Sequence, residues 1–453
     1  MHHDASPADQ GLPILERPWW SMLNRYHWFV FIVAALGWLF DTMDQQLFNL
    51  ARQPAMMDLL QVEPTDREGM KEVRRQAGYA TAIFLIGWAT GGLGFGVLGD
   101  RIGRAKTMVL TILLYSIFTG LSALSKNTWQ FMAFRFLTGL GVGGEFAVGV
   151  ALLAEVMPEK ARSFAIGWLQ SLSAVGNITA ALIALSGVSW RTMFIIGSGP
   201  ALLALVIRRR LKEPEKWQEA VRLKKERMGS YSEMFGDPRW RRNALVGLAL
   251  AFVGVVGLWG IAFFSFDLIR DVFYPVYKSQ GLSDAQIASK LSFWVGVGSI
   301  LQNLGGFFGI HFFSALSHRV GRRPAFFVSF LLAAMSTAGT FWYLGKLTGV
   351  TDVYWMLPVL GFCQLSMFGG YAIYFPELFP TRLRSTGTSF CYNVGRFVAS
   401  IGPFTLGYLA SDVYGGYGND AFRYAALTMC SVFLIGFFAL PFAPETRGQP
   451  LPE

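Results

Sequence analysis

The chain carries GVLGDRIGRAK at residues 96–106 and a related stretch, SALSHRVGRRP, at residues 314–324. The two stretches keep leucine, arginine, glycine and arginine in register, about 218 residues apart. A second pair of hydrophilic stretches, AEVMPEKARS at residues 154–163 and PELFPTRLRS at residues 376–385, repeats at a similar distance and in the same order. Two such pairs, each separated by the same succession of apolar segments, indicate that the chain is a duplicated unit.

The segments between these loops are apolar and long. A helix needs about 20 apolar residues to cross a bilayer, and hydrophobic residues make up 53% of the 453 residues while charged residues make up only 15%. The sequence therefore predicts an all-α membrane protein with twelve transmembrane helices in two pseudo-symmetric halves of six helices each. The predicted spans lie near residues 27–49, 77–99, 107–125, 129–152, 163–186, 192–208, 244–267, 291–315, 324–344, 353–375, 386–410 and 422–441.

Charged segments divide the chain and orient it. The linker between the halves is rich in arginine and lysine, and it is predicted to lie, partly helical, at the membrane surface. Because basic residues accumulate on the cytoplasmic side, both termini are predicted to be cytoplasmic in a multi-pass protein of the cell inner (plasma) membrane. The predicted divisions are a tail (1–26), a first bundle (27–207), the linker (208–243), a second bundle (244–441) and a tail (442–453).

Several function classes are not expected. The net charge of +10 is not gathered into a compact basic domain, so nucleic-acid binding is not predicted. The three cysteines lie apart in apolar segments, which gives no metal or disulfide pattern. No P-loop motif occurs, so ATP is not the energy source. The sequence predicts no cofactor and no enzymatic activity, and it predicts a monomer whose partners are a small solute, protons and the lipid bilayer.

On these motifs the chain resembles the major facilitator superfamily over essentially its whole length. Residues 96–106 are similar to the family's signature loop between helices 2 and 3. RFLTGLGVGGE (135–145) and PETRG (444–448) resemble the sugar-porter and metabolite–proton symporter branches. FDTMDQQLF (40–48) and YNVGRFVASIGP (392–403) resemble symporters of aromatic acids and other organic anions. The resemblance implies secondary transport by alternating access.

Among the charged residues inside predicted helices of the first half, three are candidates for coupling or solute binding. A charge at the bilayer centre costs at least about 2.5–3.5 kcal/mol, so such residues are functional candidates. Asp41 and Asp44 share a helix face, and two close carboxylates in a low dielectric do not both ionise easily. They are the predicted proton-coupling residues. Arg135 is predicted to pair with one of them or to bind a solute carboxylate, and a permanent inter-helix salt bridge is the structural alternative.

The second half supplies another candidate for anion binding. Arg396, beside Asn393, has no acid within its own predicted helix, so it needs an acid from another helix or an anionic solute. Polar amides in the membrane suit solute hydroxyls or hold helices together, and four are predicted to bind solute: Gln170, Asn177, Gln302 and Asn303. The predicted function is proton-coupled uptake of a small carboxylate-bearing organic acid. The alternative is a sugar or polyol transporter, either a symporter or a facilitator.

The repeated loops supply charges for a cytoplasmic gate. Ion pairs such as Arg104 with Glu155 and Arg322 with Glu377 are predicted to form when the cytoplasmic side closes and to break when it opens. Surface pairs contribute about 1 kcal/mol or less each, which suits two states of similar free energy. Simple positive-inside anchoring is the alternative. The predicted gating residues are Asp100, Arg101, Arg104, Glu145, Glu155, Arg162, Arg319, Arg322, Glu377 and Arg384.

Overall fold

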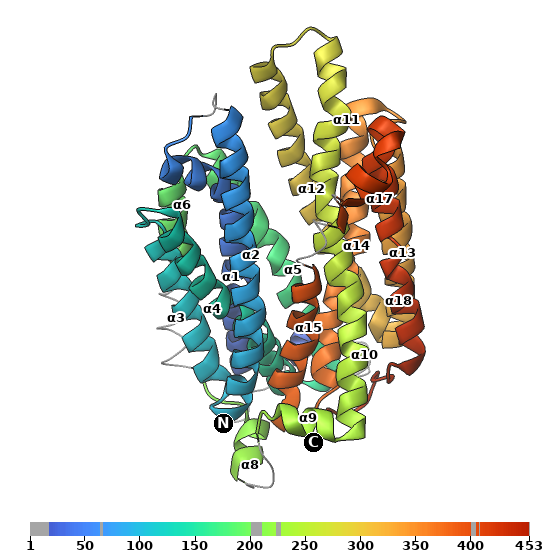
Figure 1. Ribbon diagram of the computed structural model, residues 1–453. Coiled ribbons are helices and arrows are strands. Elements are labelled where there is room, and N and C mark those ends of the chain that lie inside the picture. Colours follow the sequence, from blue (N-terminus) through green and yellow to red (C-terminus); the bar gives the residue numbers. More distant parts are fainter. Residues whose placement is uncertain are drawn as a thin grey trace, which may run out of the picture.

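The computed structural model describes residues 18–63, 67–200, 211–222, 228–399, 405–406 and 408–452. Within these ranges all regular elements are helices and no strand occurs. The helices form two bundles side by side (Figure 1), the first within residues 25–197 and the second within residues 238–442. The all-α membrane fold predicted from the sequence is confirmed.

Each bundle consists of long helices joined by short turns. The first bundle comprises α1 (Arg25–Leu60), α2 (Arg67–Arg101), α3 (Arg104–Ser122), α4 (Thr128–Val156), α5 (Glu159–Leu185) and α6 (Trp190–Gly197). The second comprises α10 (Pro238–Val255), α11 (Ser265–Ser279), α12 (Asp284–Val320), α13 (Arg322–Tyr343), α14 (Val353–Glu377), α15 (Arg384–Ala399), α17 (Ala421–Met429) and α18 (Val432–Ala439). The linker contains α8 (Glu215–Arg222) and α9 (Tyr231–Gly236).

Short non-α segments complete the described helices. A π segment, Val256–Ile261, joins α10 to α11. The 3-10 turns are η2 (Trp19–Met22), η4 (Ala262–Phe264), η5 (Gly349–Asp352), η6 (Thr381–Leu383), η8 (Gly415–Asp420) and η9 (Leu440–Phe442), and a second π segment is Leu409–Val413.

Ten helical stretches of the described residues are long and apolar enough to cross a membrane. The two remaining predicted spans, 192–208 and 386–410, run into residues outside the described ranges. Several helices exceed the bilayer core. At 1.5 Å per residue, the 36 residues of α1 extend about 54 Å, against a hydrocarbon core of about 30 Å.

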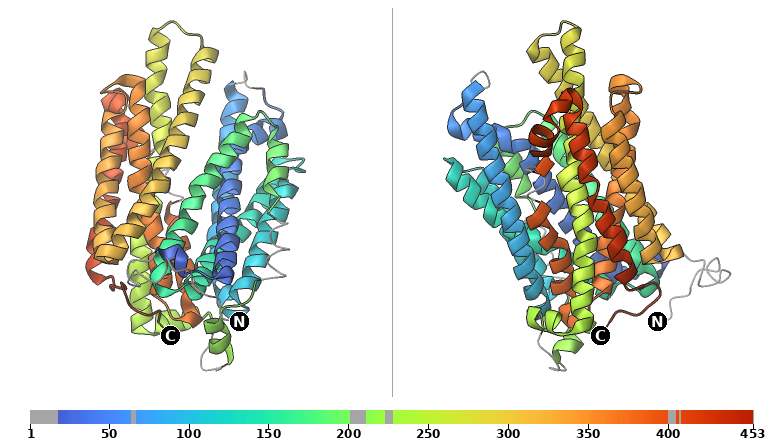
Figure 2. Two further views of the ribbon diagram at one scale, coloured as in Figure 1. Left: turned by 180° about the vertical axis from the view of Figure 1, so that it is seen from behind. Right: turned by 45° about the vertical axis from the view of Figure 1, so that its right-hand side comes forward.

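One end of the molecule carries both the linker helices and the ends of the described chain (Figures 1 and 2). The Tyr26 hydroxyl donates to the Lys212 carbonyl (3.2 Å), and Arg384 donates to the Pro452 carbonyl (3.1 Å). We call this end the terminal end and the opposite one the far end. Residues 1–17 of the predicted N-terminal tail, and residues 208–210 and 223–227 of the predicted linker, lie outside the described ranges.

The repeated loops form the same turn in both bundles. Gly103 has φ +112° and Gly321 has φ +100°, a conformation that residues with a side chain rarely adopt. A Cβ atom on Gly103 would also overlap the Glu213 carboxylate, and one on Gly321 would lie 2.7 Å from the Glu445 carboxylate. The glycine of each copy is therefore required both by the turn and by an adjacent acid.

These two acids cap matching helices. Glu213 accepts two backbone N–H bonds at the start of α3, both at 3.1 Å. Glu445 accepts two at the start of α13, at 2.9 and 3.0 Å. Each carboxylate meets otherwise unpaired N–H groups at the positive end of a helix. The duplication therefore extends to a capping glutamate that follows each bundle, and the sequence analysis did not identify this feature.

Replacing Glu445 by glutamine is expected to lower stability by about 1 kcal/mol, in the range of helix-cap losses. Burial alone would raise the pKa of Glu445, but the backbone N–H groups of Arg322, Arg323 and Arg447 bond the carboxylate and hold its pKa below the ordinary value. A carboxyl with a lowered folded-state pKa stabilises the fold above its unfolded pKa, and this contribution is lost as the pH falls through the folded-state pKa.

The measurement is the thermal unfolding midpoint in detergent as a function of pH. The difference between the wild type and Glu445→Gln should be largest near neutral pH and should shrink in acid. Glu219→Gln, at an exposed position on α8, is the matched control and should leave the midpoint unchanged. A difference that is constant across the pH range would contradict the capping role.

Candidate functional site

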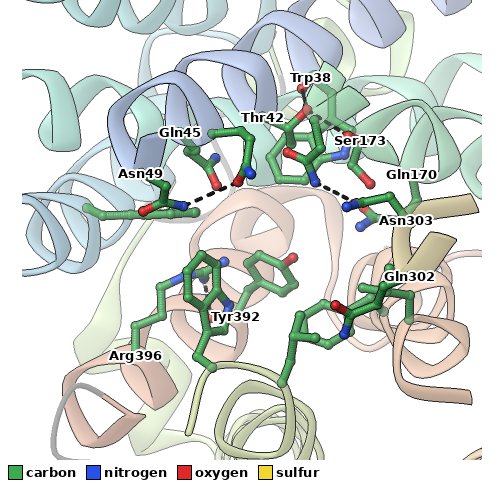
Figure 3. A pocket seen from close by; sticks show the side chains of 17 residues that line it. Trp38, Thr42, Gln45, Asn49, Gln170, Ser173, Gln302, Asn303, Tyr392 and Arg396 are labelled. Carbon is green, nitrogen blue, oxygen red and sulfur yellow. Dashed lines mark hydrogen bonds between the residues drawn. The ribbon is translucent and has the colours of Figure 1, made fainter. Parts of the chain in front are cut away.

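A cavity lies between the two bundles (Figure 3). The empty space between its lining residues is about 720 Å³ when the solvent-open part of the mouth is counted. α1, α2 and α5 line it from the first bundle, and the π segment, α12, α14 and α15 line it from the second. Aromatic and amide side chains make up most of its wall: the aromatic ones are Trp38, Trp88, Trp259, Phe368 and Tyr392, and the amides are more numerous still.

Arg396 is the one cationic side chain among the described residues that line this cavity. Its Nη1 donates to the Tyr392 carbonyl (2.7 Å) and to Asn393 Oδ1 (3.0 Å). Its guanidinium lies 4.1 Å from the Trp88 ring centroid and 4.3 Å from that of Tyr392, at cation–π distance. The side chain is 3% exposed, and its Nε has no hydrogen-bond partner.

No carboxylate of the described residues lies within ion-pair distance of Arg396, unlike the other fully buried arginines of the membrane region, such as Arg104 and Arg135. A buried charge without a counter-charge is costly, because desolvation is not offset by a partner. An anionic group that entered the cavity would supply that partner. The geometry of Arg396 therefore favours binding of an anion.

Asn393, the predicted neighbour of Arg396 in solute binding, does not line the cavity. Its Nδ2 donates to the Ser389 carbonyl (3.0 Å) and to the Gly143 carbonyl of α4 (3.4 Å). Its Oδ1 accepts from Arg396. Asn393 thus holds the Arg396 side chain in place without lining the cavity itself. It also joins α15 to the first bundle.

The four predicted amides do line the cavity. Asn177 Nδ2 of the first bundle donates to Asn303 Oδ1 of the second at 2.9 Å, which joins the bundles at this level. Asn303 Nδ2 in turn donates to the Ser299 carbonyl at 2.9 Å. Gln170 and Gln302 are nearly fully buried and retain unpartnered amide atoms.

Arg135 lies outside the cavity lining, inside the first bundle. Its Nη1 is 3.7 Å from Asp44 Oδ2, so the predicted pairing with an α1 carboxylate is present. The Thr119 hydroxyl donates to Asp44 Oδ1 (2.7 Å), and Arg135 donates to Ser122 (2.7 and 3.0 Å). The Phe194 ring lies 4.6 Å from its guanidinium. Asp44 and Arg135 therefore neutralise each other within one bundle.

Asp41 faces a different neighbour. Gln45 Nε2 donates to Asp41 Oδ2 at 3.3 Å, and Oδ1 has no partner. The Glu145 carboxylate lies against Gly37, one turn before Asp41, where an added Cβ would overlap it. Glu145 is fully buried, and neither of its oxygens has a partner. The two predicted α1 acids therefore have different nearest partners: Asp44 lies beside Arg135, while Asp41 lies toward Glu145 and remains within electrostatic reach of Asp44.

At the terminal end, buried ion pairs join the two bundles. Glu155 Oε1 accepts from Arg104 of its own bundle (2.9 Å) and from Arg384 of the other (2.7 Å). Asp100 pairs with Arg104 (3.0 Å) and accepts two backbone N–H bonds at the start of α15 (3.1 and 2.9 Å). All four side chains are fully buried in the closed contact, so this latch is not a set of surface pairs.

The matching residues of the second bundle form a different arrangement. Arg322 and Glu377 pair at 2.7 Å, as predicted, but the Thr446 hydroxyl completes this site (2.6 Å) from the same half. Arg162 is the repeat counterpart of Arg384. Among the described residues it has no carboxylate within ion-pair distance, and its Nε is unpartnered. The two predicted pairs are present, but the expected twofold latch is not.

The second latch is missing because the second copy of the repeated loop has lost an acid. Where the first copy has Asp100, the second has His318. An aspartate accepts N–H bonds at a helix start, and its charge favours that position. His318 instead packs against Phe164, with ring centroids 5.0 Å apart and the ring planes tilted by 51°. The second copy therefore has no acid with which to hold the start of the opposite helix.

Besides Arg162, Arg322 and Glu377, three more of the predicted gating residues lie outside the latch. Arg101 donates to the Met228 carbonyl of the linker (3.2 Å), and Arg319 is exposed. Glu145 precedes Glu155 by ten residues on α4, which places it about 15 Å further into the membrane region.

The sequence analysis missed several cavity residues, including Trp38, Gln45, Asn49 and Tyr392. The sequence could have indicated two of them, because Gln45 and Asn49 follow Asp41 by one and two helical turns and therefore lie on the same face of the helix. Trp259 also lines the cavity, from the π segment. Such segments often occur at functional sites.

The sequence profile described as Major Facilitator Superfamily matches residues 30–403. The chain is 32% identical to the "Probable 4-methylmuconolactone transporter" of Cupriavidus pinatubonensis, over 91% of this chain and 89% of that one. It is 28% identical to the cis,cis-muconate transport protein of Acinetobacter baylyi, over 91% of this chain and 94% of that one. It is 27% identical to the sialic acid transporter NanX of Escherichia coli, over 92% of this chain and 96% of that one. Among solved structures, the proton:xylose symporter XylE superposes with a TM-score of 0.72 at 18% identity, over 94% of this chain and 98% of that one.

Proposed function

Since the chain belongs to the major facilitator superfamily, it is a membrane transporter, and we propose that it carries a small organic acid together with protons across the inner membrane by alternating access. The observation that carries this proposal is Arg396, a buried cation in the cavity between the bundles that has no carboxylate of the described residues within ion-pair distance. Its planar guanidinium suits a carboxylate, which it can bind through two N–H groups.

The surroundings of Arg396 support an acid that has an apolar or planar part. Trp88 and Tyr392 already flank the guanidinium, and further aromatic rings continue the walls. Two relatives named above are transporters of a muconate and of a muconolactone by their names, and a third is named for sialic acid. A sugar or polyol remains the second candidate, because the cavity also presents many neutral amides.

We assign the terminal end to the cytoplasm, since it carries the basic linker. The latch at Glu155 is formed in this structure, and Asn393 and Asp100 add contacts between the bundles on the same side. In this assignment the cavity is closed toward the cytoplasm, and the solute enters from the far end. Rocking of the bundles about the cavity then exposes the solute to the other side.

Asp41 and Glu145 are the proposed proton carriers. Both are buried with unpartnered oxygens, and neither has a cation of the described residues within ion-pair distance, although Arg396 is near enough to act on Asp41 electrostatically. In such a setting a carboxyl group holds a proton more readily than a charge. Gln45 both lines the cavity and bonds Asp41. Its amide can donate to a carboxylate or accept from a carboxylic acid, so it connects solute occupancy to the protonation of Asp41.

Replacing Asp41 by asparagine is expected to abolish uptake driven by a proton gradient and to leave solute exchange at equilibrium intact. Asparagine keeps the shape of the side chain and removes the titrating proton. The measurement is uptake of labelled acid into proteoliposomes with an inward acid gradient, beside counterflow without a gradient. Glu145→Gln should behave in the same way.

Asp58→Asn is the matched control, because Asp58 is a half-exposed acid at the far end of the same helix. It should retain gradient-driven uptake. Gradient-independent uptake of a sugar, equal in the wild type and in Asp41→Asn, would sink the proposal and make the chain a facilitator.

A further inference from the structure

The cavity contains a second polar region, which lies across from Arg396 (Figure 3). It is built from Gln170 and Asn177 of α5 and from Gln302 and Asn303 of α12. Each pair comes from one bundle, so the region spans the interface between the two halves. What it recognises depends on which of its donors and acceptors are still free.

Two of these side chains have unused hydrogen-bonding atoms. Gln302 is 3% exposed, and neither its Nε2 nor its Oε1 has a partner. Gln170 is equally buried, and its Oε1 has no partner. Buried polar atoms are nearly always hydrogen-bonded in folded proteins. Both side chains line the cavity, so a group bound within it can supply the missing bonds.

Asn177 and Asn303 differ from the two glutamines because they are already hydrogen-bonded to each other, at 2.9 Å. Their bond fixes the distance between α5 and α12 at this level. A solute group bound by Gln170 and Gln302 would bridge the same two helices beside that bond. Solute bound by these amides would therefore contact both bundles at the level where the Asn177–Asn303 bond already joins them.

The chemistry of an amide defines the group that it accepts. A primary amide both donates and accepts and carries no charge, so it matches hydroxyl, carbonyl and lactone groups. A second carboxylate would find no cation here, because Arg396 is the only cationic side chain among the described lining residues. A site built to hydrogen-bond a polar group also discriminates strongly against an analogue that lacks it, since its own groups are then left unpaired.

We propose that the solute is a monocarboxylate with a neutral hydrogen-bonding group at its opposite end, which Gln170 and Gln302 bind while Arg396 holds the carboxylate. This inference rests on the proposed function, and it adds the class of acid. It favours hydroxy, oxo or lactone acids over dicarboxylates, so it sets this chain apart from the relative named for cis,cis-muconate, which is a dicarboxylate.

The test compares three probes, benzoate, 4-hydroxybenzoate and terephthalate, which differ only in the group opposite the carboxylate. Binding is measured by titration of the intact protein in detergent, followed by uptake into proteoliposomes. The wild type should bind 4-hydroxybenzoate about tenfold more tightly than benzoate, and terephthalate more weakly than 4-hydroxybenzoate. In Gln302→Leu the preference for the hydroxylated acid should fall to about twofold or less, and benzoate binding should change far less than 4-hydroxybenzoate binding.

Gln302→Met serves as a second variant of similar length, and benzoate binding reports that each variant is folded. Gln280→Leu replaces an exposed amide at the far end and should keep the wild-type preference. Equal binding of the three acids by the wild type, or an unchanged preference in both Gln302 variants and in Gln170→Leu, would overturn this inference alone. Binding of none of the acids would overturn the proposed function itself.

Discussion

Arg396→Gln is expected to reduce binding and uptake of the carboxylate solute by about 100-fold. The guanidinium is buried between two aromatic rings, and no acid of the described residues lies within ion-pair distance of it. Removing one member of a buried, hydrogen-bonded charge pair costs about 2–5 kcal/mol, and each 1.4 kcal/mol is a factor of ten in affinity. The free protein should not lose stability, because the variant removes an uncompensated buried charge.

Arg396→Lys separates charge from geometry in this experiment. Lysine keeps the positive charge but loses the planar fork and its stacking between Trp88 and Tyr392. It should recover part of the affinity and remain well below the wild type. The measurement is equilibrium binding of the acid, with Arg222→Gln on the exposed face of α8 as the control. Unchanged affinity in Arg396→Gln would exclude this residue as the carboxylate site.

Glu155→Gln is expected to shift the protein strongly toward the state that is open at the terminal end. Glu155 Oε1 accepts from both Arg104 and Arg384, and all three side chains are fully buried. Breaking a buried pair of this kind costs about 3 kcal/mol or more, because it leaves buried charge uncompensated. That cost changes the ratio of two states by roughly 100-fold. A surface pair of the kind expected from the sequence would change it by less than tenfold.

Glu377→Gln is a control that the structure itself provides. It breaks the equivalent pair with Arg322, but this pair joins residues of one bundle only. The state ratio should therefore change little. The measurement is the distance distribution between spin labels at Ile102→Cys and Val320→Cys, exposed positions at the terminal end of each bundle. The three native cysteines are replaced in this background.

The two variants together distinguish a latch from simple structural pairing. A longer distance in Glu155→Gln and an unchanged one in Glu377→Gln is the expected result. Equal shifts in both would mean that the pairs act through the stability of each bundle. An unchanged distance in Glu155→Gln would mean that these residues do not form a latch and serve only as positive-inside anchors.

Duplication explains what the terminal ends of the two bundles share, but not the difference between their ion pairs. The repeated loops conserve the glycine turn and the arginine–glutamate pair in both halves. The replacement of Asp100 by His318 removes the acid that would hold the opposite helix. Arg162 is then left without a partner among the described residues, although its counterpart Arg384 is paired.

The sequence by itself determined the number, order and apolar length of the helices, because each of these depends on a continuous stretch of residues. It also determined the internal repeat, and from it the pairs Arg104–Glu155 and Arg322–Glu377. It identified Arg396 and four amides of the cavity, because charged and polar groups are rare inside apolar segments and therefore conspicuous.

Only the tertiary structure decided which neighbour each buried group faces. Asp41 and Asp44 are three residues apart, which rotates them by about 60° around the helix axis. That rotation is small enough for both to lie on one face, and large enough for one to meet Arg135 and the other Glu145. The same holds for Asn393 and Arg396, of which only the arginine reaches the cavity. Periodicity fixes the face of a helix, but the packing of other helices against it fixes the partner.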